Sequence, residues 1–158
     1  MRFADIIEND VVNGEGVCVS LFMQGCEKHC SGCFNPDTWD FEGGKEVSSF
    51  DLANYIIELL NTNGVQRNFS ILGGEPLHPK NRQETLFIIQ IIRHVYPDIK
   101  IWIWTGYTIE ELKAMNDKVI NEILDNINVL IDGPYIEAKR DLSLPYCGSY
   151  NQRIIKIK

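Results

Sequence analysis

A chain of 158 residues suits one domain with a single hydrophobic core, and it is too short for a complete eight-stranded βα barrel, which takes about 250 residues. Its net charge of −7 argues against non-specific nucleic-acid binding, and its apolar runs are far shorter than the ~20 residues of a membrane span. The N-terminal segment carries acidic residues where a signal peptide would be apolar, so we expect one cytoplasmic domain over residues 1–158 that binds neither nucleic acid nor a membrane.

Strands and helices are predicted to alternate along the chain. Short apolar or alternating runs predict strands, whereas apolar residues spaced three or four positions apart predict helices. The predicted strands are residues 3–7, 17–23, 68–72, 99–104, 127–132 and 153–158. One predicted helix begins at Ser48 or Ser49 and places Leu52, Tyr55, Ile56 and Leu59 on one face, a second covers residues 83–95, and a third begins after Thr108.

This alternation predicts crossover connections and a mostly parallel sheet. We therefore expect an α/β fold in the form of a partial TIM-like βα barrel. Chemically distinctive residues follow four of the predicted strands: the cysteines of residues 26–33, Gly73-Gly74-Glu75, Thr105-Gly106-Tyr107 and Asp132-Gly133-Pro134-Tyr135. Because ligands bind at the carboxyl ends of parallel strands, these motifs predict one shared site.

Three of the five cysteines lie in the segment Q-G-C-E-K-H-C-S-G-C-F-N-P-D-T-W with the spacing C-x3-C-x2-C. A structural zinc site takes four ligands, usually as two separated pairs, so Cys26, Cys30 and Cys33 would need a distant fourth ligand such as Cys147. Four cysteines normally hold a [4Fe–4S] cluster, and three leave one iron open to a small molecule. The spacing therefore favours an iron–sulfur cluster with an open iron.

This cysteine spacing after an N-terminal strand resembles the signature of the radical S-adenosylmethionine enzymes. Further motifs in the same order, between Val11 and about Ile154, resemble the activating proteins of the anaerobic (class III) ribonucleoside-triphosphate reductases. These motifs are V-V-N-G-E-G, G-C-E-K-H-C-S-G-C-F-N-P-D-T-W, G-G-E-P-L-H-P, W-T-G-Y, V-L-I-D-G-P-Y and G-S-Y-N-Q-R-I.

The resemblance implies that Cys26, Cys30 and Cys33 ligate a [4Fe–4S] cluster whose open iron binds S-adenosyl-L-methionine. The expected cofactor contacts are Gly32, Cys33, Phe34, Gly73, Gly74, Glu75 and Thr105. It further implies that a 5′-deoxyadenosyl radical removes a hydrogen atom from a glycine of the large catalytic subunit of the reductase. A flavodoxin-like reductant would supply the electron, and no catalytic acid or base is expected, because a hydrogen atom rather than a proton is removed.

Several alternatives remain open at this point. The Gly-Gly-Glu-Pro segment also suits an ordinary turn, and Asp132 is either an active-site carboxylate or a cap within a turn. Trp102 and Trp104 are predicted in the core, Trp39 is predicted to shield the cluster, and Cys18 is predicted to be a buried apolar residue. For function, the alternatives are a small radical S-adenosylmethionine enzyme that acts on a free metabolite, a zinc-binding module without catalysis, and an iron–sulfur electron carrier.

Overall fold

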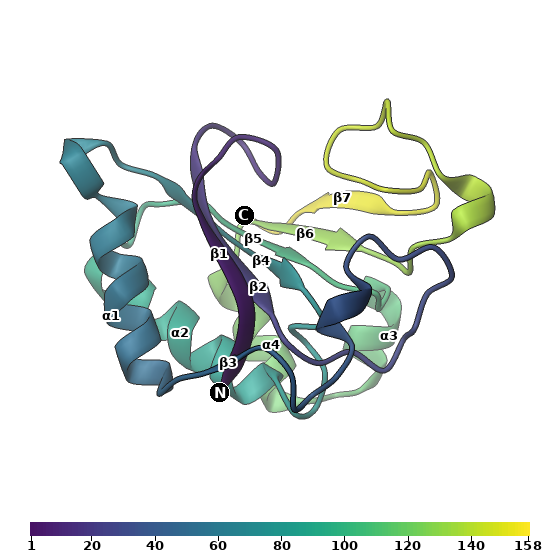
Figure 1. Ribbon diagram of the computed structural model, residues 1–158, viewed down its shortest axis with the longest axis horizontal. Coiled ribbons are helices and arrows are strands. Elements are labelled where there is room, and N and C mark those ends of the chain that lie inside the picture. The colour runs from purple at the N-terminus through teal and green to yellow at the C-terminus, as the bar shows by residue number, and fades with distance from the viewer.

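The computed structural model describes residues 1–158 and contains one seven-stranded sheet with helices gathered on one side (Figure 1). The strands are β1 (Arg2–Asp10), β2 (Cys18–Met23), β3 (Lys45–Glu46), β4 (Asn68–Gly73), β5 (Ile101–Trp104), β6 (Val129–Asp132) and β7 (Arg153–Lys156). The α-helices are α1 (Ser49–Leu60), α2 (Arg82–Val95), α3 (Ile109–Ala114) and α4 (Lys118–Asn126), and the 3-10 turns are η1 (Pro36–Thr38), η2 (Thr62–Gly64) and η3 (Glu137–Lys139). None of the helices has the length and apolar composition that crossing a membrane requires.

The sheet has the order β3-β1-β2-β4-β5-β6-β7. Its four central strands β2, β4, β5 and β6 are parallel, and they are connected by helices. The outer pairings of β1 with β2 and β3, and of β6 with β7, are antiparallel. The predicted α/β class and parallel centre are confirmed. The sheet is open, with β3 and β7 as its edges, so the expectation of a partial TIM-like barrel is not confirmed.

Side chains of the central strands alternate between the two faces of the sheet, as a pleated strand requires. Ile71 and Ile103 belong to the main core between the sheet and the helices, whereas their neighbours Leu72 and Trp104 line a cavity on the opposite face. Trp102 is buried on that opposite face, in a small cluster that is separate from the main core. The prediction that both tryptophans lie in the core therefore holds for Trp102 but not for Trp104, which lies at the end of its strand where the sheet meets the cavity.

The helix signals of the sequence are confirmed at the N-termini. Ser48 caps α1 by accepting a hydrogen bond from the Asp51 amide at 3.0 Å, and Thr108 forms a capping box with Glu111 at the start of α3. Tyr55 does not share the buried face of α1. Its side chain is exposed, and its hydroxyl donates to a Glu8 carboxylate oxygen at 3.3 Å, because it lies at the polar margin of the apolar stripe.

Helix α4 was not predicted, although its signals are present. The carboxylate of Asp117 accepts a hydrogen bond from the Ile120 amide at 3.0 Å, and Ile120, Ile123 and Leu124 form its buried stripe. The preceding helix α3 is only six residues long, and Asn116 adopts a left-handed backbone conformation between the two helices. Because α3 and α4 are separated by only a few residues, the sequence pattern did not indicate a second helix.

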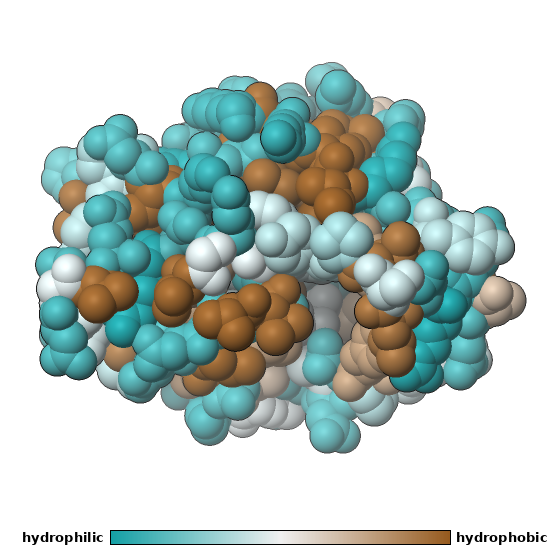
Figure 2. Space-filling model, turned by 90° about the horizontal axis from the view of Figure 1, so that it is seen from above, coloured by the Kyte–Doolittle hydropathy of each residue, from teal (hydrophilic) through white to brown (hydrophobic).

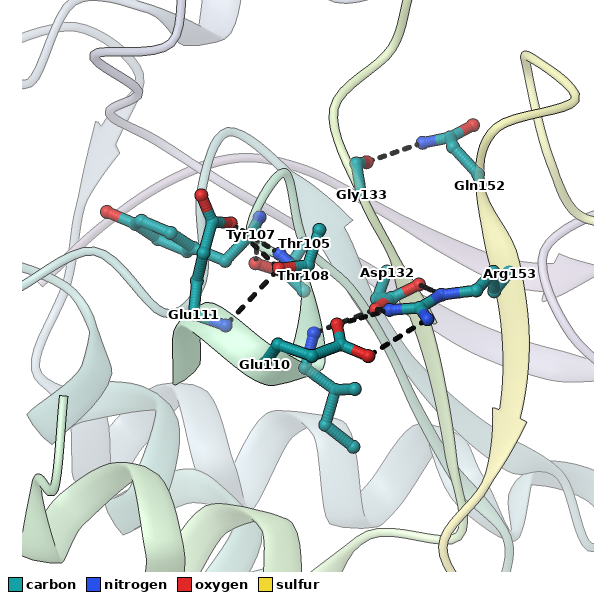
Figure 3. A network of polar contacts seen from close by, with 10 residues as sticks. Thr105, Tyr107, Thr108, Glu110, Glu111, Asp132, Gly133, Gln152 and Arg153 are labelled. Atoms are coloured by element: carbon teal, nitrogen blue, oxygen red, sulfur yellow. Dashed lines mark hydrogen bonds and ion pairs between the residues drawn. The ribbon is translucent and has the colours of Figure 1, made fainter. Parts of the chain in front are cut away.

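A network of charged groups holds the start of α3, the end of β6 and the start of β7 together (Figure 3). The buried Asp132 carboxylate accepts hydrogen bonds from Arg153 at 2.9 and 2.5 Å and from the Ile109 amide at 2.8 Å. Arg153 also donates to both carboxylate oxygens of Glu110, which lowers the Glu110 pKa to about 2. Asp132 is therefore a structural carboxylate and not a member of the cavity wall.

The same network anchors residues 133–152, which we call the C-terminal loop. The loop leaves the sheet after Asp132 and returns at Arg153, and these two residues are register partners in the β6–β7 pairing. The Gln152 side chain donates to the Gly133 carbonyl at 3.0 Å and thereby closes the base of the loop (Figure 3). The loop is thus fixed over the face of the sheet that carries the cavity.

The Asp132→Ala variant is expected to lower the free energy of unfolding by about 2–4 kcal/mol, because the change removes three hydrogen bonds from the interior of the network. Urea denaturation followed by circular dichroism measures this loss. Glu110→Ala is the matched control, because it removes the exposed partner of the same arginine and should cost far less. Equal losses for the two variants would contradict the assigned role of Asp132.

Candidate functional site

A cavity of about 530 Å³ lies over the carboxyl ends of the central strands, on the face opposite the helices. All four motifs predicted to share one site contribute to its lining. The contributing motif residues are Cys26, Cys30 and Cys33, Gly73, Gly74 and Glu75, Thr105 and Gly106, and Gly133 and Tyr135. The structure therefore brings the four motifs together at one cavity, and their roles in binding stay predictions. Figure 2 shows apolar side chains gathered around the hollow on the surface of the molecule.

The cysteine loop, residues 24–39, is closed at its base by backbone hydrogen bonds. The amides of Gly25 and Cys26 donate to the carbonyls of Thr38 and Trp39 at 2.7 and 3.1 Å. The buried side chain of Gln24 donates to two further carbonyls at the end of the loop. These bonds tie the loop to the end of β2 and leave its cysteine-bearing part to face the cavity.

The three thiols of the cysteine loop are half-buried and line the same cavity. Burial raises the pKa of the Cys26 and Cys30 thiols, so iron would displace their protons on binding. The Asn35 amide donates to the Cys33 sulfur at 3.4 Å. No group of three or more histidine, cysteine, aspartate or glutamate side chains is arranged to hold a single metal ion. Soft thiolate donors around a roomy cavity fit an iron–sulfur cluster.

The other two cysteines differ in their surroundings. Cys18 is fully buried in β2, as predicted for a small apolar residue. Cys147 lines the cavity from the C-terminal loop and packs against the small cluster that contains Trp102. Trp39 also lines the cavity, and its ring stacks on His29 with centroids 4.5 Å apart.

The Gly-Gly turn at the end of β4 packs backbone to backbone against the end of β2 and the start of the cysteine loop. A Cβ added at Gly73 would lie 2.8 Å from the Met23 nitrogen, and one added at Gly74 would lie 2.6 Å from the Gly25 carbonyl oxygen. The Gly74 amide donates to the Met23 carbonyl and the Glu75 amide to the Gly25 carbonyl, both at 2.9 Å. Only glycine permits this close approach of the two backbone segments.

The carboxylate of Glu75 is almost fully buried and joins the end of β4 to the end of β5. One oxygen accepts hydrogen bonds from the Leu77 amide at 3.0 Å and the Thr105 hydroxyl at 2.7 Å, and the other accepts the Gly106 amide at 2.7 Å. Burial raises the Glu75 pKa, against the opposing effect of these three hydrogen bonds. A carboxylate has about four acceptor positions, so one remains for a cationic ligand in the cavity.

Aromatic side chains form one wall of the cavity. The rings of Phe34 and Tyr135 lie 4.9 Å apart, and the buried hydroxyl of Tyr135 has no hydrogen-bond partner within the protein. This wall suits a flat ligand that carries a polar group. Gly32 is not part of the lining, because its α-carbon faces the carboxylate of Glu137, and its cofactor contact stays a prediction. Thr105 lines the cavity and is held by Glu75.

Two residues of the site were given no role of their own in the sequence analysis. The buried Asn81 side chain donates to the carbonyls of Gln24 and Gly25, both at 3.2 Å, and to that of Glu75 at 2.9 Å. Tyr135 was noted only as part of a motif. Neither residue carries a local signal, because its role depends on segments that are distant in the sequence.

The neighbours of the Gly-Gly-Glu turn lie outside the main cavity. Tyr107 lies beneath the Lys28 ammonium, 3.9 Å from its ring centre, beside a smaller cavity. His78 has a structural role there: it contacts Glu27 at 3.1 Å and accepts a hydrogen bond from the Lys80 amide at 3.1 Å.

Comparison with known proteins identifies the family. Residues 12–155 match the family model of the 4Fe-4S single cluster domain. The chain is 38% identical to the anaerobic ribonucleoside-triphosphate reductase-activating protein of Pasteurella multocida, with 99% of this chain and 98% of the relative covered. It is 40% identical to the Escherichia coli K12 protein of that name, with 96% of each covered, and 33% identical to that of phage T4, with 98% and 93% covered. The chain therefore belongs to the family of the anaerobic ribonucleoside-triphosphate reductase-activating proteins.

Proposed function

We propose that this protein uses a [4Fe–4S] cluster and S-adenosyl-L-methionine to generate a glycyl radical on the large catalytic subunit of the anaerobic ribonucleoside-triphosphate reductase. One observation carries the proposal: the three thiols of the C-x3-C-x2-C motif and the Gly-Gly-Glu turn open into the same cavity. The names of the relatives support the reductase as the partner. We further place the protein in the cytoplasm, with a flavodoxin-like protein as its reductant.

Cys26, Cys30 and Cys33 would hold the cluster and leave one iron without a protein ligand. When bound, the cluster and S-adenosylmethionine together supply the electron and the 5′-deoxyadenosyl radical that removes a hydrogen atom from the glycine of the partner. The remaining steps belong to the protein, which must bind the cofactor in one orientation, exclude water and admit the partner.

The cofactor would lie along the strand ends. Its ammonium group would be held at Gly73, Gly74 and Glu75, where the turn brings backbone close and the carboxylate retains a free acceptor position. Its adenosine would lie near Phe34 and the backbone of Gly32. Thr105 would act through Glu75, whose carboxylate it fixes by a hydrogen bond.

The cavity also suits radical chemistry in its apolar parts. Phe22 and Leu72 from the sheet, Trp39 from the cysteine loop and Trp104 from β5 all line it. These side chains offer few polar groups to water and no general base at the centre of the cavity. Because the reaction removes a hydrogen atom, no general base is needed. The residues that line the cavity act by binding the cofactor and by excluding water.

Alanine replacement of Cys26, Cys30 or Cys33 is expected to abolish cluster assembly, because each removes a thiolate ligand. Iron and sulfide analysis after anaerobic reconstitution, together with the visible absorption of the cluster, measures the result. Cys147→Ala is the matched control, because Cys147 lines the same cavity but lies outside the motif. Loss of the cluster in the control alone would contradict the assignment.

Glu75→Gln is expected to weaken S-adenosylmethionine binding by about tenfold or more, since the amide presents a donor where the carboxylate accepts. The cluster content should remain unchanged, because Glu75 is not a thiolate ligand. Equilibrium dialysis with the reconstituted protein gives the affinity. Glu42→Gln, which removes an exposed charge outside the cavity, should bind the cofactor like the unmodified protein.

The overall proposal is tested by reducing the reconstituted protein without oxygen and adding S-adenosylmethionine, with and without the reductase subunit. We expect 5′-deoxyadenosine as product and an EPR doublet from a glycyl radical on that subunit. 5′-Deoxyadenosine without the glycyl radical would contradict the choice of partner and favour a free metabolite as substrate. A protein that takes up zinc in place of iron and does not cleave the cofactor would overturn the proposal.

A further inference from the structure

Two loops frame the opening of the cavity. Val12 lies in the β1–β2 turn, residues 11–17, and Leu142 lies in the C-terminal loop. Both side chains line the cavity, yet they are 71% and 73% exposed, so they stand at its mouth. Val11, which precedes Val12 in the chain, is 70% exposed and does not line the cavity. Both loops project from the sheet on the side away from α4 (Figure 1), which is the side seen in Figure 2.

The β1–β2 turn is held rigidly in this position. The buried carboxylate of Asp10 accepts hydrogen bonds from the amides of Val12 and Asn13 at 2.8 and 3.1 Å and from the Asn13 side chain at 2.7 Å. The Ser70 hydroxyl of β4 donates to the Asn13 carbonyl at 2.6 Å. The two valines are therefore presented to solvent on a fixed backbone, in the motif V-V-N-G-E-G that the cofactor site does not explain.

The C-terminal loop is braced against the cysteine loop on the opposite side of the mouth. The Ser31 hydroxyl donates to the Glu137 carboxylate at 3.2 Å, and the Arg140 guanidinium lies 5.3 Å from the centre of the Phe34 ring. Leu142 lies two residues after Arg140. The segment that leads to Leu142 is thus held beside the cysteine loop.

We propose that Val11, Val12 and Leu142 form a docking rim for the glycine-bearing segment of the reductase subunit, which enters between the two loops as an extended chain with apolar side chains beside its glycine. This inference rests on the proposed function. A glycine reaches the cavity only if the residues that flank it pass the mouth. A small metabolite inside the cavity would leave Val11 untouched, whereas a protein segment that crosses the rim covers all three side chains.

The physical advantage of such a rim lies in its fixed, exposed apolar surface. Covering the three side chains removes apolar surface from water, which favours association. Because Asp10 and Ser70 already hold the turn, little conformational entropy is lost there on binding. Apolar burial and a preorganised backbone thus act in the same direction.

The test compares the reconstituted full-length protein with a Val11→Ser/Val12→Ser double variant and with Leu142→Ser. Anaerobic titration calorimetry with the reductase subunit should show binding that is weaker by about tenfold or more for each. Cluster content should not change, because none of the three residues is a thiolate ligand. Val65→Ser is the control, because Val65 is also exposed but lies beyond α1, outside the cavity lining, and it should bind the reductase normally.

A photo-crosslinking amino acid at position 142 identifies the occupant of the rim. A crosslink to the glycine-bearing segment of the reductase supports the proposal. A crosslink to a second copy of this chain, or rim variants that bind the reductase like the unmodified protein while that protein forms the glycyl radical, would overturn the docking rim alone. An unmodified protein that binds the reductase and never forms the radical would instead overturn the proposed function.

Discussion

The site depends on the close approach of two backbone segments, the Gly73-Gly74 turn and the start of the cysteine loop. The turn accepts no side chain at this contact, since a Cβ at Gly74 would meet the Gly25 carbonyl at 2.6 Å. Asn81 reinforces the contact by donating to carbonyls on both segments. From there Glu75 carries the connection to β5 through Thr105. These main-chain contacts set the position of the start of the cysteine loop relative to the acceptor groups of Glu75.

Packing on the opposite face of the sheet supports this arrangement. The alternation that directs Ile71 and Ile103 into the core between sheet and helices also directs Leu72 and Trp104 toward the cavity. A register error in a central strand would exchange these sets and place core residues in the cavity wall. The helices therefore contribute to the site at a distance, because they hold each strand in register while leaving the other face free.

The location of the site could be predicted, whereas much of its construction could not. Parallel strands bring their carboxyl ends together, so distinctive residues after β2, β4, β5 and β6 had to meet. The partners of Asp132 could not be predicted, because Arg153 follows 21 residues later and joins it only through the β6–β7 pairing. Asn81 and the unpartnered hydroxyl of Tyr135 likewise become visible only in three dimensions. The cysteine spacing itself favoured an iron–sulfur cluster over zinc, whereas the expectation of S-adenosylmethionine came from resemblance.

The way in which the C-terminal loop is attached has an evolutionary consequence. Its two ends, Asp132 and Arg153, are neighbours across one strand pair, so the chain leaves the sheet and re-enters it at nearly the same point. The entropic cost of closing such an excursion grows only slowly with its length. Insertions, deletions and substitutions within the loop can therefore accumulate with little effect on the sheet. The length of the loop can thus differ between proteins without moving the two strand ends that it joins.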